Sequence, residues 1–272
     1  MKSDLSAKNT QDDAPSKMAA SEILRHEVHE GLDAIRRPTS TLFVSALSGG
    51  LDVGFSVFLM AVVQTIAKDK LPEPIVTLLV ANMYSVGFIF VVVGRSELFT
   101  EQTSLAVLPL LRGKATLPSV ARLWVVVYLA NILGAVAFAL IISYVAPALH
   151  VASPESFGVI GHRLIDHGGH VILLSAILAG WLMGLLSWMV SAARDTISQI
   201  VIVWMVTAAI GLGGLHHVVL GTVEVLAAMF AHQGVTFGDF FRFLFWATVG
   251  NAFGGSVFVA LIKFGHARPV PN

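Results

Sequence analysis

The stretch 211-GLGGLHHVVLGTVEVLAAMF-230 places closely spaced glycines and two adjacent histidines inside a long apolar run. Residues 197–210 before the glycines and 218–230 after the histidines are largely hydrophobic. Burying an unpaired polar group costs free energy, so an imidazole in such surroundings is expected to have a hydrogen-bond partner or a functional role. The fold must therefore account for His216 and His217.

The composition is that of a membrane protein. Of the 272 residues, 56% are hydrophobic and 12% are charged, and the mean hydropathy is +0.79. A soluble domain averages about a quarter charged residues, and several apolar runs exceed the roughly 20 residues that a helix needs to cross a bilayer. The net charge is zero, so we expect no nucleic-acid partner, and the absence of cysteine excludes disulfides and thiolate metal sites.

Six apolar runs predict six membrane-spanning helices. They cover residues 41–67, 75–111, 120–146, 170–192, 197–230 and 237–264. The second and fifth runs are too long for one crossing, and each contains a break: 94-GRSELFTEQTS-104 in the second and 211-GLGGLHH-217 in the fifth. We expect half-helices to restart near residues 105 and 218. The chain then divides into a cytoplasmic tail (1–40), a channel domain (41–264) and a second cytoplasmic tail (265–272).

The two halves of the chain resemble each other. The segments 45-SALSGGLDVG-54 and 175-SAILAGWLMG-184 share Ser-Ala and two glycines, five and nine residues after the serine. The segments 130-ANILGA-135 and 250-GNAFGG-255 share Asn-x-x-Gly at an offset of 120, which also aligns Gly94 with Gly214. Three spans in each half force the second half to insert inverted. We predict an all-α integral membrane protein with two inverted three-helix repeats, whose interrupted second and fifth helices mark the substrate site.

Residues 21–37 have the pattern of an amphipathic helix. Leu24, Val28, Leu32 and Ile35 form one apolar stripe, and Arg36-Arg37-Pro38 ends it. We expect this helix to lie at the membrane surface. Residues 1–20 have no apolar core, so we expect no cleavable signal peptide.

Lysine and arginine are distributed unequally between the predicted loops. With both termini inside, the inner side carries Arg25, Arg36, Arg37, Arg112, Lys114, Arg122, Arg194, Lys263, Arg268 and three lysines of the tail. The outer loops carry Lys68, Lys70, Arg163 and Arg242. The excess on one side predicts cytoplasmic termini. We separately expect the membrane to be a bacterial inner membrane.

The two breaks suggest a site that attracts anions and exchanges protons. Backbone groups freed at mid-membrane must be packed in protein or line a polar cavity, and a restarted helix presents a partly positive N-terminus that attracts anions. His216 and His217 follow the glycines after a single leucine, which favours a proton-exchanging or anion-attracting imidazole. In the other break, Thr100 is suited to hydrogen-bond an imidazole, and Glu97 to hold the loop by accepting backbone N–H bonds.

The motifs 94-GRSELFTEQT-103, 211-GLGGLHHVV-219 and 250-GNAFGGSVF-258 resemble those of the formate/nitrite transporter family, over about residues 40–264. The resemblance implies an aquaporin-like protomer within a homopentamer in the lipid bilayer. Each protomer would have its own pore for small monovalent anions or their neutral acids. The pore residues implied are His217 facing Thr100, with Leu98 and Phe99 flanking and constrictions at Tyr84, Phe88 and Ile210.

The chain also departs from the family pattern. His216 stands where the family has glutamate, and Gly180 and Gly221 stand where it has asparagine. The lysine expected before the fourth span falls near Leu164, beside Arg163. These departures indicate a divergent branch and leave the permeant species open.

Two rival functions need different residues. A divalent metal-ion transporter would use His162, Asp166, His167 and His170, or His216, His217 and Glu224, since imidazole and carboxylate suit Zn²⁺. An intramembrane hydrolase would need a nucleophile or a metal-bound water beside a base. No His-Glu-x-x-His or Gly-x-Ser-x-Gly motif occurs, so we expect neither enzymatic activity nor a cofactor.

Asp52 lies inside the first predicted span, where an acid costs about 2.5–3.5 kcal/mol. Three placements stay open for it: a pore-facing position, a contact with a neighbouring protomer, or a packed pairing with a polar partner.

Overall fold

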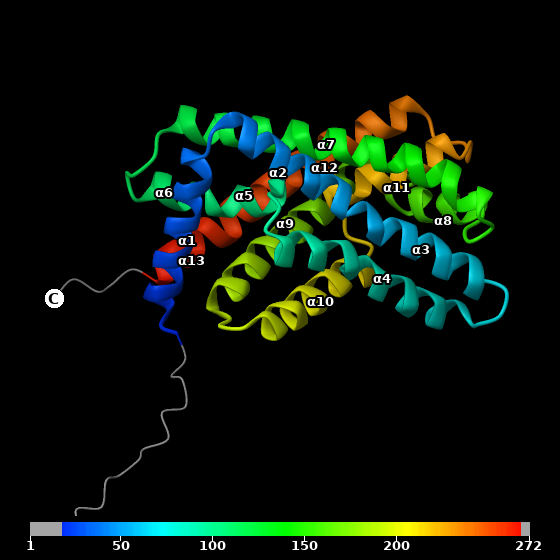
Figure 1. The fold of residues 1–272 in the computed structure, drawn as a ribbon, viewed down its shortest axis with the longest axis horizontal. Helices are drawn as coiled ribbons and strands as arrows, with labels where there is room; N and C mark the ends of the chain where they lie inside the picture. The colour runs from blue at the N-terminus through cyan, green and yellow to red at the C-terminus, as the bar shows by residue number, and fades with distance from the viewer. Residues whose placement is uncertain (1–17, 268–272) are drawn as a thin grey trace, which may run out of the picture.

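Every regular element is helical within residues 18–267, which the computed structural model describes (Figure 1). The ends of the predicted tails, 1–17 and 268–272, lie outside the described residues, together with three lysines and Arg268. The helices are α1 (Ala20–Arg36), α2 (Thr39–Asp52), α3 (Gly54–Ala67), α4 (Glu73–Gly94), α5 (Phe99–Leu105), α6 (Val107–Leu111), α7 (Leu117–Ala148), α8 (Pro154–Ile165), α9 (Gly169–Ala192), α10 (Thr196–Leu212), α11 (Val218–Phe230), α12 (Phe237–Phe253), the π-helix η1 (Gly254–Leu261) and α13 (Ile262–His266).

The predicted spans correspond to the observed helices. Within residues 18–267, five helical segments are long and apolar enough to cross a membrane: Thr39–Ala67, Glu73–Gly94, Leu117–Ala148, Gly169–Ala192 and Phe237–His266. The shorter apolar helices α10 and α11 make up the interrupted fifth span. Large apolar side chains, among them Leu129, Leu174 and Phe241, are exposed on the outer faces of this bundle, as expected for a surface in contact with lipid.

The two halves of the bundle are packed alike. In the first half α2 lies against α7, and in the second α9 lies against α12. At the first contact a side chain on Gly50 would collide with the Asn131 carbonyl oxygen, and at the second a side chain on Gly180 would collide with the Asn251 carbonyl oxygen. The repeated glycines found in the sequence are therefore crossing points where the two helix backbones touch. Gly180 fits its position for this reason.

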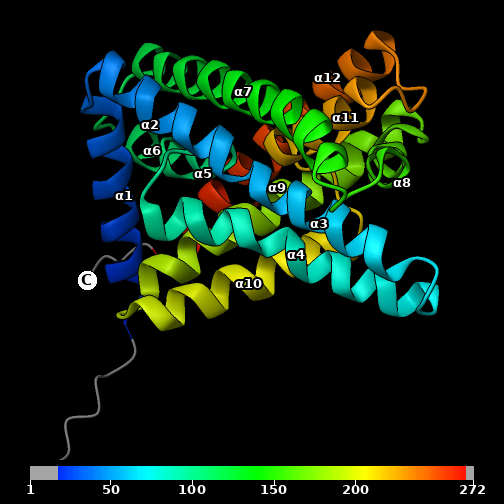
Figure 2. The same cartoon turned by 45° about the vertical axis from the view of Figure 1, so that its right-hand side comes forward.

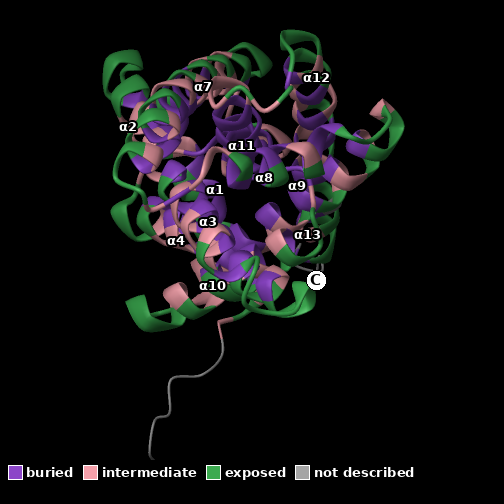
Figure 3. Ribbon diagram, turned by 90° about the vertical axis from the view of Figure 1, so that its right-hand side faces the viewer, coloured by how far each residue is buried: buried purple, intermediate pink, exposed green. Residues whose placement is uncertain are grey.

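Helices α1 and α8 cap opposite ends of the bundle (Figures 1 and 2). Seen end-on, α11 is surrounded by the other helices, and its residues 218–228 are buried without a gap (Figure 3). Arg163 was predicted to lie in an outer loop, whereas residues 154–165 form helix α8. It forms because Phe157, Ile160 and Leu164 recur at helical spacing and are all buried, and because Pro154 is favoured at the first helical position.

Asp52 is paired with polar side chains. Its Oδ2 accepts hydrogen bonds from Ser48 (3.1 Å) on the preceding turn and from Ser96 (3.0 Å) in the first break. Of the three placements left open by the sequence, the structure shows the packed pairing. The acid thus joins the end of α2 to the break between α4 and α5.

Helix α1 carries a buried acid. Leu24, Val28 and Ile35 of the predicted stripe are buried, and Glu27 is buried among them. Its Oε1 accepts hydrogen bonds from Ser187 (3.0 Å) and Ser191 (2.6 Å) on α9. Burial raises the pKa of Glu27 from 4.5 to about 7, although the two serine hydroxyls act in the opposite direction.

The docking of α1 is expected to weaken as the pH rises. A raised pKa means that docked Glu27 binds its proton more tightly than free glutamate does. The resulting stabilisation is therefore full below pH 4.5 and is lost as the pH rises through about 7. The shift corresponds to roughly 3 kcal/mol.

The measurement is the mobility of a spin label attached to His26→Cys, an exposed position on α1 in a chain that has no other cysteine. The label should gain mobility between about pH 5 and about pH 8. Glu27→Gln should remove this change, and Glu22→Gln, at an exposed position on the same helix, should preserve it. A label that responds equally in all three proteins would show that Glu27 does not control the docking.

Candidate functional site

Each interrupted span turns on a residue in the left-handed conformation. Arg95 (φ 59°) ends α4, and Gly214 (φ 58°) follows α10. The structure thus pairs Gly214 with Arg95, one residue later than the Gly94 predicted from the sequence offset. Helix α11 restarts at Val218, as predicted, whereas α5 restarts at Phe99 and not near residue 105.

One asparagine holds the first break. The side-chain oxygen of Asn131, on α7, accepts the Phe99 N–H at 2.8 Å. Its amide group donates to the carbonyls of Ala46 (2.6 Å) and Glu97 (3.0 Å). With its first N–H satisfied in this way, α5 can begin directly after a break of four residues. This is why the helix restarts earlier than predicted.

A second asparagine holds the other break in the same way. The side-chain oxygen of Asn251, on α12, accepts the Val218 N–H at 2.8 Å. Its amide group donates to the carbonyls of Ala176 (2.8 Å) and His216 (2.9 Å). The repeated Asn-x-x-Gly in the sequence therefore supplies matching supports for the two breaks. This structural role of the asparagines was not predicted from the sequence, although the repeat itself was its signal.

The two restarted helices meet through His217 and Thr100. The His217 Nε2 lies 2.8 Å from the Thr100 Oγ1, and both side chains are buried. The His217 Nδ1 also accepts the Leu220 N–H at 3.2 Å, as the N-cap of α11. Because Nδ1 is an acceptor, the proton of the neutral imidazole resides on Nε2, which donates to the threonine oxygen. The Thr100 hydroxyl proton is then available to another acceptor.

The predicted constriction residues form an aromatic column beside this pair. The Phe88 ring packs edge-on against the His217 ring, with centroids 5.0 Å apart, and stacks with the Tyr84 ring at 5.5 Å. Ile210 is fully buried. Phe99 points instead toward Trp124 and Tyr128 on α7, with ring centroids 6.1 and 5.0 Å apart.

A cavity lies on each side of the His217–Thr100 pair. The α1-side cavity, of about 350 Å³, is lined by α1, α9, the end of α4 from Val91 and the first break. The α8-side cavity, of about 340 Å³, is lined by Tyr84, Ile210, Glu224, α8 and residues 211–215. Along α4 the Phe88 contact with His217 falls between the two. The pair lines neither cavity, so passage from one to the other requires side chains to move.

Leu98, the last residue of the first break, is buried. The Glu97 carboxylate is bound by side chains and not by the backbone N–H groups that were predicted. It accepts hydrogen bonds from Arg37 (2.6 Å), just after α1, and from the Gln102 side chain (2.5 Å). The predicted acceptance of backbone N–H bonds by Glu97 is therefore wrong. Side chains satisfy this carboxylate because Asn131 and Ser45 already serve the backbone of the break.

His216 is directed away from Thr100. Its Nδ1 lies 2.8 Å from the Ser175 hydroxyl oxygen, and its Nε2 donates to the Leu164 carbonyl at 3.0 Å. The side chain thus ties the second break to α9 and to the end of α8. These contacts give the residue a structural role, while His217 makes the contact between the two halves.

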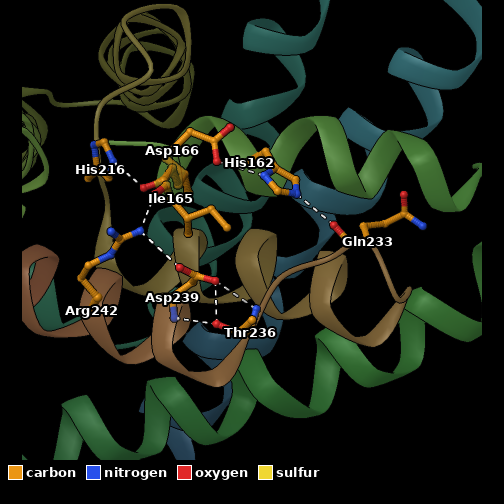
Figure 4. Close-up of polar contacts among 9 residues, drawn as sticks. His162, Ile165, Asp166, His216, Gln233, Thr236, Asp239 and Arg242 are labelled. Carbon is orange, nitrogen blue, oxygen red and sulfur yellow. Dashed lines mark hydrogen bonds and ion pairs between the residues drawn. The ribbon is translucent and has the colours of Figure 1, made fainter. Parts of the chain in front are cut away.

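The metal-transporter alternative requires a cluster of side chains that can bind a metal ion. Within residues 18–267, no group of three or more His, Asp or Glu side chains is placed to hold a metal ion. His162 contacts Asp166 (3.0 Å) and the Gln233 carbonyl (2.9 Å), as Figure 4 shows. Both partners are acceptors, so both ring nitrogens act as donors, and the hydrogen bond to Asp166 followed by that to Gln233 raises the pKa of His162. A doubly protonated ring has no lone pair for a metal.

Fold and site together define a multi-pass helical membrane transporter with two breaks that meet at its centre. The sequence profile of the Formate/nitrite transporter family matches residues 21–265 of this chain. The chain belongs to the formate/nitrite transporter family, which confirms the resemblance and places it among transporters and not among enzymes.

Individual proteins are similar over nearly the whole chain. Inner membrane protein YfdC of Escherichia coli (strain K12) is 32% identical over 263 residues, which cover 95% of this chain and 81% of the relative. Among solved structures, an FNT family ion channel has a TM-score of 0.82 at 21% identity and covers 92% of this chain and 100% of its own. A pentameric formate channel with formate bound has a TM-score of 0.72 at 23% identity, covering 84% and 97%. These likenesses confirm the predicted fold class.

Proposed function

We propose that this protein is a channel for small monovalent anions of the formate and nitrite type, or for their neutral acids, and that His217 and Thr100 exchange a proton with the solute. The observation that carries the proposal is the 2.8 Å contact between His217 and Thr100, where the two breaks meet between two cavities. The formate/nitrite transporter family and the formate channel of similar fold support this solute class.

The energetic problem is the apolar column between the cavities. Moving an isolated carboxylate from water into an apolar medium costs tens of kcal/mol in the Born limit. A solute that takes up a proton before it passes Phe88 avoids most of this cost. The proton donor must therefore stand beside the column, as His217 does.

The geometry suggests the path of the proton. An anion arriving beside the pair favours the protonated imidazole, because opposite charges attract strongly at low dielectric. The new proton enters at the His217 Nδ1 and displaces the Leu220 N–H bond. The Nε2 proton then moves to Thr100 Oγ1 as the threonine hydroxyl proton passes to the anion. The solute leaves neutral, and the histidine becomes the neutral Nδ1–H tautomer.

The assembly and orientation form part of the proposal. We infer a homopentamer in a bacterial inner membrane, supported by the pentameric formate channel of similar fold and by the inner-membrane relative. Residues 41–264 would form the channel domain, with the α1 end of the bundle and both tails in the cytoplasm. The lysine and arginine distribution supports this orientation.

The test is a solute panel in proteoliposomes at two pH values. Formate and nitrite should enter faster than protein-free liposomes allow, and formate flux should rise as the pH is lowered, since a proton accompanies the anion. Chloride, the conjugate base of a strong acid, should be carried poorly because it cannot be neutralised by a proton. Equal flux of chloride and formate, or no flux of either weak acid, would contradict the proposal.

A further inference from the structure

The α8-side cavity contains two polar side chains that the proposed proton exchange does not use. Tyr84 is 3% exposed and Glu224 is 6% exposed, and both line this cavity. Tyr84 comes from α4 in the first half of the chain, and Glu224 from α11 in the second. They lie on the α8 side of the His217–Thr100 pair, and Tyr84 is about one helical turn from Phe88 along α4.

Neither side chain has a hydrogen-bond partner among the described residues. The Tyr84 hydroxyl is a buried oxygen that hydrogen-bonds to nothing else within residues 18–267. No hydrogen bond or salt bridge joins the Glu224 carboxyl to another described residue, and Tyr84 does not donate to it. Buried polar groups in native proteins are almost always paired, so these two require an explanation.

The protonation of Glu224 follows from its surroundings. An ionised carboxylate removed from water without a bonded cation is far more costly than the neutral acid. Besides Glu224, the titratable side chains that line the cavity within the described residues are Tyr84 from α4, Arg163 from α8 and His167 from the turn after α8. Arg163 is exposed and forms no salt bridge with the acid. In the resting cavity, the Glu224 carboxyl is therefore protonated and neutral.

A neutral carboxyl and a phenol are both hydrogen-bond donors, and a guanidinium is a donor with a positive charge. The cavity thus presents three donor groups, and none of them has an acceptor among the described residues. Its volume of about 340 Å³ is within the usual range for small-molecule sites. The ligand that matches these three donors is a small group with several lone pairs and one negative charge.

We propose that Tyr84, Glu224 and Arg163 form a binding subsite for a small oxyanion, such as a carboxylate or nitrite, in the α8-side cavity. Tyr84 and neutral Glu224 donate to the oxygens of the anion, and Arg163 balances its charge. The subsite rests on the proposed function, because it holds the anion before proton exchange at His217. Loss of the Glu224 proton removes a donor and places a negative charge beside the anion, so the subsite releases its ligand in alkaline solution.

The test compares the formate concentration at half-maximal flux in proteoliposomes. Tyr84→Phe and Glu224→Leu should each raise this concentration about tenfold, the effect of losing one good hydrogen bond. Glu224→Gln keeps a neutral donor, so its half-maximal concentration should stay low and should change less than that of the wild type as the pH rises. Tyr128→Phe, which removes a hydroxyl paired with Thr248, and Glu155→Gln, at an exposed position, should behave as the wild type.

The outcomes separate this proposal from the proposed function. A wild type that carries formate, together with Tyr84→Phe and Glu224→Leu variants that saturate as it does, would overturn the subsite alone. A folded wild type that carries neither formate nor nitrite would overturn the proposed function. An ammonium flux that is present in the wild type and lost in Glu224→Gln would show an ionised Glu224 that selects cations, and would also overturn the subsite. Size-exclusion chromatography of each variant confirms that it is folded.

Discussion

The His217→Asn variant is expected to lose the pH-dependent flux of formate, by at least about a hundredfold, which is the usual contribution of a positioned proton donor. Asparagine is the informative replacement because its side-chain oxygen can still accept the Leu220 N–H as an N-cap. The restart of α11 is then preserved, and the variant lacks only the group that takes up and releases a proton. The measurement is formate uptake into proteoliposomes at two pH values.

Thr100 provides the matched pair of variants for this experiment. Thr100→Ser keeps the hydroxyl that contacts the His217 Nε2 and should retain most of the flux. Thr100→Val has nearly the same shape without the hydroxyl and should lose flux as His217→Asn does. If the asparagine variant keeps wild-type flux at both pH values, His217 is not the proton donor. If serine and valine at position 100 behave alike, the threonine does not relay the proton.

The sequence predicted the features that depend on local composition and on the repeat. The six spans follow from hydropathy, and the buried face of α1 follows from the spacing of Leu24, Val28 and Ile35. The break before α11 could be located because glycines occur inside an apolar run. The breaks suggested that Thr100 bonds an imidazole, the family resemblance implied that this imidazole is His217, and the structure brings the two residues together.

The features that were missed depend on contacts between distant segments. The restart of α5 at Phe99 is set by Asn131, which lies one span later, so the polar run at 94–104 looked like a longer break. Glu97 was assigned backbone partners because nothing in its own segment reveals that Arg37 reaches it from the end of α1. His216 looked equivalent to His217 in the sequence. Its partners, Ser175 and the Leu164 carbonyl, are supplied by α9 and α8.

Helix α8 was missed for a different reason. Its polar residues, among them His162 and Asp166, were interpreted as a loop with possible metal ligands. The apolar residues between them recur at helical spacing and indicate the helix. The same polar residues are the exposed side of an amphipathic helix, whose apolar side packs against α3 and α11. A short helix at the end of a bundle gives a weak hydropathy signal, and its helical periodicity is what distinguishes it from a loop.

Replacing Asn131 or Asn251 with leucine is expected to cause the largest loss of stability in this chain. Each side chain makes three hydrogen bonds, one to the first N–H of a restarted helix and two to carbonyls in other segments. Leucine has a similar size and makes none of them. Each buried backbone group left without a partner costs about 1–3 kcal/mol, so we expect each substitution to lower the free energy of unfolding by roughly 4 kcal/mol or more.

The two asparagines test the internal symmetry as well as the stability. If the halves are equivalent supports for the two breaks, the two leucine variants should unfold at similar concentrations of denaturant in detergent. Asn82→Leu is the matched control, because the Asn82 amide donates to the Leu78 carbonyl of its own helix and accepts from the Trp204 indole on α10, and so holds no break. A leucine at position 131 or 251 that costs no more than one at position 82 would show that the breaks support themselves. A large effect at one of the two positions alone would show that only that half depends on its asparagine.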